Sequence, residues 1–319
     1  MSLKEKILIE LENHPNTFFS GQDLANQFHV SRNAIWKTIQ ILKKEQYPII
    51  SSKNGYGMND NYDNLSSNLI KQHLIQPNLD IFIYDEVDST NNEAKRLLSQ
   101  SNPNSSFLVL AKQQVGGRGR QGKSFYSPKD NGIYMTFVFS PHQSFDNIVN
   151  ITCYAALCVQ KAIEKIYHQT CQIKWVNDVF YQEKKICGIL TEAISDFESN
   201  TVQHVIIGIG INLYPNEVPE NLKDVIGFLD CKKGYKNHLI AEITNELMLF
   251  EKNNHHFMEE YKKYSMVLNQ EITYTHNNQT FIGKVLDIDK KGALIIQNEK
   301  NEMDILNSGE ISIRVKKTK

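Results

Sequence analysis

Hydrophobic positions at the start of the chain fall into short helical repeats separated by polar turns. Residues 3–13 carry apolar side chains at spacings typical of one helical face, which predicts a helix. Ser20 and Asp23 have the spacing of a capping box, so a second, short helix is predicted to run through Phe28. The chain is expected to turn at His29, which joins this helix tightly to the next.

A third helix is predicted over residues 32–44, where apolar side chains at i, i+4 and i+7 face a core and Ser31 supplies the cap. Its other face is basic and polar, and the segment contains no acidic residue. A strand over 47–52 and the turn dipeptide Asn54-Gly55 predict a hairpin. The arrangement is that of a winged helix-turn-helix, whose third helix would enter the major groove of DNA. The side chains expected to contact DNA are Ser31, Arg32, Asn33, Lys37, Gln40 and Lys53.

The middle of the chain mixes strand-like and helix-like segments. Residues 59–67 are polar without apolar periodicity and are predicted to be a linker. Strands are expected at 80–86, 106–112, 132–139, 172–175, 184–192 and 203–213, and helices at 91–100, 147–168 and 237–264. Because strands come in pairs between single helices, the pattern favours an α+β domain with a mixed sheet over a doubly wound βαβ series.

Short apolar segments separated by turns fill the last part of the chain. The turns are expected at 276–278, 289–292, 298–301 and 307–309. This spacing predicts a small, SH3-like β-barrel. The chain is therefore expected to divide into three domains, over residues 1–63, 64–267 and 268–319.

Composition narrows the class of protein. The chain has 319 residues, 40% of them hydrophobic and 22% charged, as in ordinary soluble globular proteins. Its formal net charge of −1 excludes a generally basic coat for nucleic acid, so any DNA contact must come from a local patch. The acid-free face of residues 32–44 is such a patch. The alternative interpretation is a solvated amphipathic helix that binds nothing.

The sequence also argues against a membrane protein and against a protein with a structural metal site. The longest apolar runs, such as 205–213, are far shorter than a bilayer requires, and charges within the first helix argue against a signal peptide. The five cysteines are scattered and form no CxxC pair, which predicts reduced thiols and neither a disulfide framework nor a zinc site. A cytoplasmic protein without membrane association is expected.

The strongest chemical feature is a glycine-rich loop between two predicted strands. Four of the sixteen glycines lie within residues 116–122, and the basic side chains of Arg118, Arg120 and Lys123 are interleaved with them. Glycines let backbone N–H groups approach an anion, and arginines add bidentate bonds to it. A Walker A loop is excluded because a strand follows and not a helix. The alternative is a mobile surface loop with incidental charge.

A second feature joins a polar turn to a strand. Asn177 and Asp178 end one strand, and Lys185 alternates with apolar neighbours on the next. A buried lysine needs an anionic partner. A lysine and an aspartate brought together across a hairpin suit stabilisation of a carboxylate and orientation of an attacking amine. Asn177-Asp178 alone is an ordinary hairpin turn.

Two weaker motifs have simpler alternatives. Ser89 and Thr90 end a strand and begin a helix, where free N–H groups and hydroxyls can hold a polar ligand or merely cap the helix. Gly208-x-Gly210 closes an apolar strand, and without a third glycine and a following helix it indicates close backbone packing as readily as a dinucleotide site.

Taken in order along the chain, these motifs resemble the biotin–protein ligases, specifically the bifunctional kind that also represses the biotin operon. The matching residues are Asp88-Ser-Thr-Asn91, Gln114, Gly117-Arg-Gly-Arg120, Lys174-Trp-x-Asn-Asp178, Lys185, Gly188-Ile-Leu, Gly208-x-Gly-Ile-Asn212, Gly292-Ala-Leu294 and Ser308-Gly-Glu-Ile-Ser-Ile-Arg314. The resemblance covers essentially the whole chain. Two positions depart from it: Val176 replaces a common proline, and Lys123 stands where a further arginine is usual.

The resemblance implies a role for each site residue. Those implied to bind biotin are Ser89, Thr90, Asn91, Gln114, Arg118, Gly119, Arg120 and Lys185. Those implied to bind ATP or the adenylate are Gly117, Arg118, Arg120, Lys123, Asn177, Lys185 and Asn212. Lys185, Asp178 and Arg118 are implied to be catalytic, with Asp178 orienting the incoming amine.

The resemblance also implies the activity and its partners. Biotin and ATP, with Mg²⁺ on the nucleotide, would give biotinoyl-AMP, and biotin would then pass to a lysine of a biotin carboxyl carrier protein domain. Biotinoyl-AMP would act as corepressor, favouring a homodimer on the operator DNA of biotin genes. No metal site of the protein's own is expected. Two alternatives stay open: a lipoate- or octanoate-handling relative, and a ligand-sensing transcriptional regulator without ligase activity.

Overall fold

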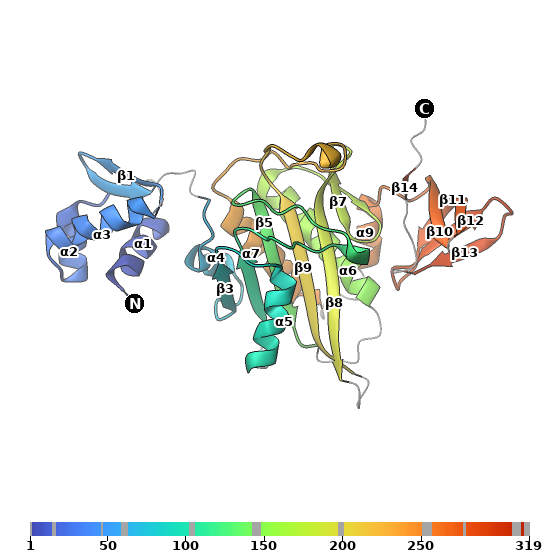
Figure 1. Cartoon of the computed structure of the whole chain (residues 1–319), viewed down its shortest axis with the longest axis horizontal. Helices are drawn as coiled ribbons and strands as arrows, with labels where there is room; N and C mark the ends of the chain where they lie inside the picture. The colour runs from blue at the N-terminus through green and yellow to red at the C-terminus, as the bar shows by residue number, and fades with distance from the viewer. Residues whose placement is uncertain are drawn as a thin grey trace.

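The computed structural model places three units in a row along the long axis of the molecule (Figure 1). The N-terminal unit is a small helical domain with a hairpin, the central unit is a mixed sheet with helices, and the C-terminal unit is an antiparallel sheet. The predicted fold class is confirmed. The structure describes residues 2–14, 17–45, 47–58, 63–101, 106–141, 148–196, 201–250, 257–276, 279–307 and 314–315.

The N-terminal unit has the predicted winged helix-turn-helix order. Ser20 and Ser31 accept hydrogen bonds from the amides of Asp23 and Ala34, so both predicted caps form. His29 ends the second helix in the left-handed region, with φ of 54°. The apolar faces of the helices meet in a core of their own. The elements are α1 Leu3–Asn13, α2 Gly21–Phe28, α3 Arg32–Lys44, β1 Ile49–Ser52 and β2 Gly55–Met58.

A polar interface joins the N-terminal unit to the central one. It involves a short helix, α4 Ser67–His73, whose first residue lies in the predicted linker and which the sequence pattern missed because it is under two turns long. Glu12 of α1 accepts from the Ser66 hydroxyl at 2.9 Å, and Asn13 accepts from the Asn68 amide at 3.0 Å. Linker residues 59–62 lie outside the described residues.

The central sheet has seven strands in the order β3-β4-β5-β9-β8-β7-β6, and β3 and β4 are its parallel pair. The mixed sheet is therefore confirmed. The strands are β3 Asp80–Tyr84, β4 Phe107–Ala111, β5 Gly132–Phe139, β6 Gln172–Lys174, β7 Asp178–Tyr181, β8 Lys184–Asp196 and β9 Thr201–Asn212. The strand β7 was not predicted, because Asn177-Asp178 signals a turn and the strand after it has only 4 residues.

Helices cover the two faces of this sheet unequally (Figure 1). Helices α6 Ile148–Tyr167 and α7 Lys236–Met248 bury one face in the main core, and α5 Thr90–Ser101 packs on part of the other. The prediction of one helix over 237–264 is wrong. Helix α7 ends at Met248 and α9 Phe257–Tyr264 follows separately. The helix is interrupted at Leu249, which caps α7, and residues 251–256 lie outside the described residues.

The C-terminal unit is a five-stranded antiparallel sheet in the order β13-β12-β11-β10-β14. Its strands are β10 Glu271–His276, β11 Gln279–Ile288, β12 Leu294–Asn298, β13 Met303–Leu306 and β14 Arg314–Val315. The predicted turn at 289–292 forms, with Gly292 at φ of 84°. Parts of the turns at 276–278 and 307–309, and the family-like residues 308–313, lie outside the described residues.

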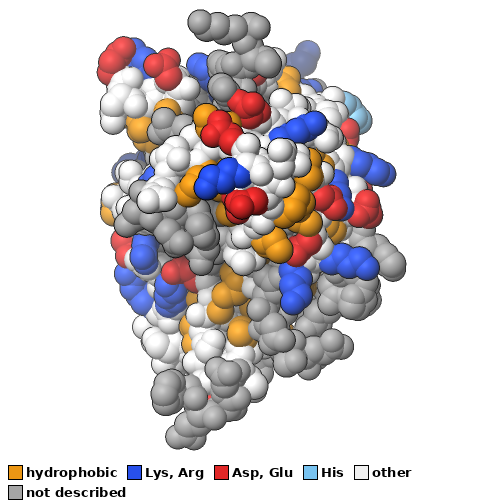
Figure 2. Space-filling model, turned by 90° about the vertical axis from the view of Figure 1, so that its right-hand side faces the viewer, with side chains coloured by type: hydrophobic (Ala, Val, Ile, Leu, Met, Phe, Trp, Pro, Cys, Tyr) orange, Lys and Arg blue, Asp and Glu red, His pale blue; other side chains and the backbone are white. Residues whose placement is uncertain are grey.

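The C-terminal unit contacts the central unit close to the sheet edge. The Trp175 indole donates to the Gly292 carbonyl at 2.7 Å, and Lys262 of α9 pairs with Asp287 at 2.8 Å. Seen from this end, acidic and basic side chains are interspersed with apolar ones over the visible face (Figure 2). Among the described residues, no helix is long and apolar enough to cross a membrane. All five cysteines are free thiols, as predicted.

Candidate functional site

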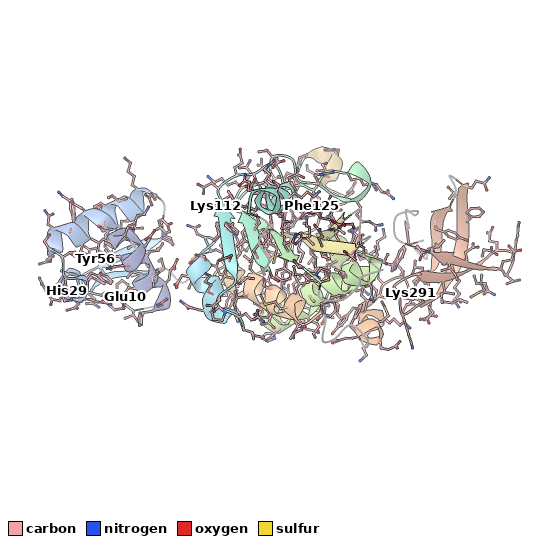
Figure 3. The ribbon with its side chains drawn as sticks, turned by 90° about the horizontal axis from the view of Figure 1, so that it is seen from below. Glu10, His29, Tyr56, Lys112, Phe125 and Lys291 are labelled. Carbon is pink, nitrogen blue, oxygen red and sulfur yellow. The ribbon has the colours of Figure 1, made fainter. Side chains whose placement is uncertain are left out.

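The open face of the central sheet lies opposite α6 and α7. Side chains alternate along a strand, so Ile207 and Ile209 of β9 enter the main core and Gly208 and Gly210 face the other way. The Phe125 ring lies on this floor: a Cβ at Gly210 would come within 2.4 Å of its Cε1 atom. Figure 3 shows Phe125 on the side of the sheet away from those two helices. The glycine pair therefore marks close packing and not a dinucleotide motif.

The glycine-rich loop is held by backbone bonds on both sides. The Val115 and Gly116 amides donate to the carbonyls of Val87 and Asp88, at 3.0 and 2.8 Å. Within the loop, the Gly119 amide donates to the Lys123 carbonyl at 2.6 Å. A Cβ at Gly117 would lie 2.5 Å from the Phe125 carbonyl oxygen, so this position requires glycine. These contacts give the loop a defined conformation and favour the binding role over incidental charge.

Ser89, Thr90 and Gln114 meet where α5 begins. The Gln114 side-chain oxygen accepts from the Thr90 amide at 2.9 Å and from its hydroxyl at 3.2 Å. The Gln114 amide nitrogen donates to the Ser127 hydroxyl at 2.9 Å. The structure thus joins Thr90 and Gln114 in one polar cluster, and Ser89, which precedes Thr90 in the chain, is buried beside the start of α5.

Asn91, the fourth, is built into the wall behind this cluster. Its side-chain oxygen accepts from Thr136 at 2.7 Å, and its nitrogen donates to the Leu190 carbonyl and to Glu192 at 3.3 and 2.9 Å. The residue is 3% exposed, and a Cβ at Gly208 would collide with it at 2.2 Å. These contacts suit a residue that fixes the start of α5 against the sheet.

Lys185 and Asp178 form an ion pair across two neighbouring strands, as predicted. The Lys185 ammonium lies 2.7 Å from the Asp178 carboxylate, and the two side chains are 28% and 24% exposed. A Cβ at Gly188 would lie 3.3 Å from the same ammonium and 3.1 Å from the Phe125 ring. The pair therefore lies on the floor that also carries the aromatic ring. Both side chains are partly exposed, but the Asp178 Oδ1 atom that faces the ammonium is buried.

The two loop arginines are placed differently. Arg120 is half-buried and donates to the Asn177 side-chain oxygen at 3.1 Å. Burial lowers the pKa of Arg120, and the nearby Asp178 carboxylate acts in the opposite direction. Arg118 is exposed and donates to Asn92 of α5 at 3.2 Å. The site therefore has an inner guanidinium beside the ion pair and an outer one at the rim.

Residues after β9 close over the end of the site. The Asn212 carbonyl accepts from the Leu229 amide at 3.0 Å, and the Lys185 carbonyl accepts from the Gly227 amide at 2.7 Å. A cavity of about 700 Å³ opens beside this segment and the turn before β8. It is lined by Gln182, Lys184, Pro215, Asn216, Glu217, Val218, Lys223, Ile226, Gly227, Phe228 and Asp230.

Sequence reasoning missed two residues of this site. Phe125 was not singled out, although an aromatic residue directly after a glycine-rich loop is a usable signal. Asn92 follows the Ser89–Asn91 motif and is distinguished only by its contacts in the fold. Lys123, which was expected to bind the nucleotide, is exposed near the tip of the loop.

The face of α3 predicted to contact DNA is exposed. All six side chains expected to reach DNA lie on the surface, and Trp36 between them is 51% exposed. The core side of the helix is fully buried, with Ile35, Ile39 and Leu42 at 0% exposure. The surface is thus separated cleanly from the core, as a helix entering a groove requires.

Family models match all three units. Residues 4–57 match the HTH domain, residues 84–212 the biotin/lipoate A/B protein ligase family, and residues 267–314 the biotin protein ligase C terminal domain.

Individual proteins match over nearly the whole chain. The bifunctional ligase/repressor BirA of Bacillus subtilis is 32% identical over 317 residues, covering 93% of this chain and 94% of that protein. The corresponding protein of Escherichia coli is 24% identical over 307 residues, with 93% of each chain covered. Among solved structures, the biotin protein ligase from Aquifex aeolicus in complex with biotin and ATP aligns with a TM-score of 0.63 at 28% identity, covering 74% of this chain and 99% of that one.

Proposed function

The chain belongs to the bifunctional biotin–protein ligase/repressor family, and from that membership we propose how its residues perform the two activities. The protein is a biotin ligase that uses ATP, and it carries a DNA-binding domain of repressor type. The observation that carries the assignment of residues is the Lys185–Asp178 pair on a glycine floor, flanked by Arg120 and a polar cluster.

In the first step, an oxygen of the biotin carboxylate attacks the α-phosphorus of ATP. The bond from that phosphorus to the β-phosphate oxygen breaks, pyrophosphate leaves, and biotinoyl-AMP remains. Negative charge gathers on the carboxylate and phosphate oxygens, so fixed cations lower the barrier. We assign Lys185 to the reacting oxygens, and Arg118 and Arg120 with the loop amides to the phosphate. Mg²⁺ accompanies the triphosphate as part of the substrate.

In the second step, a lysine amine of a biotin carboxyl carrier domain attacks the acyl carbon of biotinoyl-AMP. An amide bond forms, the mixed anhydride breaks and AMP leaves. The Asp178 carboxylate accepts a hydrogen bond from the incoming amine and its proton, because it lies at the same floor as the acyl group held by Lys185.

The other site residues are assigned to the ureido ring, the adenine and the support of Arg120. Ser89, Thr90 and Gln114 bind the ureido ring, and Asn91 holds them in place from behind. Asn177 orients Arg120, and Asn212 lies beside the adenine. The proposed domains are 1–63, 64–267 and 268–319. The separate N-terminal core supports the first boundary. The second follows the change from the mixed sheet to the antiparallel sheet, whose buried residues share one apolar cluster with the central unit. We place the protein in the cytoplasm, where carrier protein and operator DNA are both accessible.

The outer arginine supplies the first prediction. Arg118→Lys keeps the charge and loses the planar fork that grips a phosphate with two bonds. We expect the adenylate to escape into solution and acylate lysines on unrelated proteins, so that labelling of a bystander such as serum albumin rises severalfold. Arg32→Lys, at an exposed arginine of α3 in the N-terminal unit, measures the general effect of such a change on labelling. Bystander labelling equal to that of the unmodified protein would contradict the assignment of Arg118 to the adenylate.

The second prediction concerns repression. We propose that the protein binds operator DNA as a homodimer whose formation biotinoyl-AMP promotes. One recognition helix makes few phosphate contacts, whereas two copies on a palindrome add theirs. We expect biotinoyl-AMP, more than biotin or ATP alone, to strengthen both self-association and operator binding. Operator DNA must then favour the dimer by the same coupling free energy. Sedimentation with each ligand and a footprint on biotin-gene promoters test this. A dimerisation constant unaffected by the adenylate would refute the proposed switch.

A further inference from the structure

A charged cluster at the start of α5 stands next to the glycine-rich loop and is not used by the proposed reaction. The Arg96 guanidinium donates two bonds to the two Asp88 oxygens, both at 2.9 Å, and a third to Glu93 at 2.6 Å. This fork-to-carboxylate geometry is the strong form of the ion pair. Hydrogen bonding from Arg96 lowers the pKa of Asp88 to about 2, so its carboxylate is ionised at neutral pH.

Asn92 lies between this cluster and the outer arginine of the site. Its amide nitrogen donates to Asp88 at 2.7 Å, and its oxygen accepts from the Arg118 guanidinium at 3.2 Å. The orientation of the amide is forced, because an ionised carboxylate accepts only and a guanidinium donates only. Asp88 therefore holds the amide in the one orientation that presents a carbonyl oxygen to Arg118.

Asp88 also holds the backbone of the loop that carries Arg118. The Asp88 carbonyl accepts from the Gly116 amide at 2.8 Å, two residues before Arg118. Asp88 thus anchors the loop through its backbone and the guanidinium through Asn92. Both contacts come from α5 and the residues just before it and not from the loop, so the Arg118 side chain already has a partner without a ligand.

We propose that Asn92, oriented by the Asp88–Arg96 pair, is a positioning residue that presets the Arg118 guanidinium for the adenylate phosphate. The proposal rests on the assignment of Arg118 to the adenylate given above. A long, exposed arginine loses rotamer freedom when it grips a ligand, and prior fixing of the side chain removes part of that cost. Asn92 touches neither substrate in this account and acts through Arg118.

The test is the rate at which preformed biotinoyl-AMP leaves the full-length protein. Labelled adenylate is chased with an excess of unlabelled biotinoyl-AMP, and the bound label is followed by filter binding. We expect Asn92→Ala to speed release about tenfold, which corresponds to about 1.4 kcal/mol. Asn92→Gln retains the amide and should recover most of the lost retention. Ser99→Ala, an exposed position of the same helix, is the matched control and should release the adenylate at the unmodified rate.

A double-mutant cycle separates positioning from a structural effect. If Asn92 acts through Arg118, Asn92→Ala adds less than twofold in an Arg118→Ala background. Alanine is a better helix former than asparagine, so the melting temperature should not fall. Release within twofold of the unmodified protein, or the same tenfold change in both backgrounds, would overturn the proposal. If Arg118→Ala alone leaves release unchanged, the assignment of Arg118 itself is wrong, a distinct result.

Discussion

Lys185→Ala is expected to slow biotin adenylation by two to three orders of magnitude, the loss typical of removing a preorganised charge from an acyl-transfer site. The Lys185 ammonium lies 2.7 Å from Asp178 and directly over the Gly188 backbone, where the reacting oxygens would be placed. Arg120, the nearby guanidinium, is engaged with Asn177. Biotin-dependent exchange of pyrophosphate into ATP measures this step without carrier protein.

The fold should survive this substitution. The Asp178 side chain is 24% exposed, so water can reach part of the carboxylate, although the Oδ1 atom that faces Lys185 is itself buried. Lys284→Ala removes an exposed lysine from strand β11 of the C-terminal sheet and is the matched control. We expect the control to exchange pyrophosphate at the unmodified rate and both variants to melt within a few degrees of the parent. Exchange by Lys185→Ala within threefold of the parent would contradict the assignment.

Asp178→Asn is expected to slow transfer to the carrier lysine about a hundredfold, and to slow adenylation much less. Asparagine keeps the shape of aspartate but cannot take a proton from the attacking amine. Because the carboxylate also pairs with Lys185, some loss of adenylation is expected as well. The informative quantity is the ratio of the two effects.

Two single-turnover measurements give that ratio. One follows transfer from preformed biotinoyl-AMP to carrier protein, and the other follows adenylate formation without carrier. Raising the pH should restore part of the transfer in Asp178→Asn, because a larger fraction of the lysine amine is then unprotonated. Equal losses in both steps would mean that Asp178 only supports Lys185 and has no part in transfer.

Local signals were sufficient for the N-terminal unit and for the mixed character of the central sheet, but they missed strand β7. Ser20 and Ser31 cap their helices as the spacing predicts, and the apolar repeat of α3 is fully buried. These features depend on neighbours in sequence, which a pattern captures. The ion pair between Asp178 and Lys185 was also predictable, because seven residues across a hairpin bring two side chains to adjacent strands.

Tertiary contacts decide the remaining features. The role of Asn91 changes because Thr136, Leu190 and Glu192 surround its amide, and no motif shows this. The position of Phe125 depends on the absence of a Cβ at Gly210, which lies 85 positions later in the chain and is brought near only by the sheet. The position of Arg118 depends on Asn92 of another element.

Substrate choice is the most direct test of the account, because a lipoate- or octanoate-handling relative would share the pocket lysine. The decisive measurement is exchange of pyrophosphate into ATP by the full chain, run in parallel with biotin, lipoate and octanoate. The polar cluster of Ser89, Thr90 and Gln114 suits the hydrogen-bonding ureido ring, and neither lipoate nor octanoate carries such a group. We expect exchange with biotin at least a hundredfold above that with either fatty acid. Exchange with lipoate or octanoate as fast as with biotin, or no exchange with biotin, would contradict the assignment of this protein as a biotin ligase.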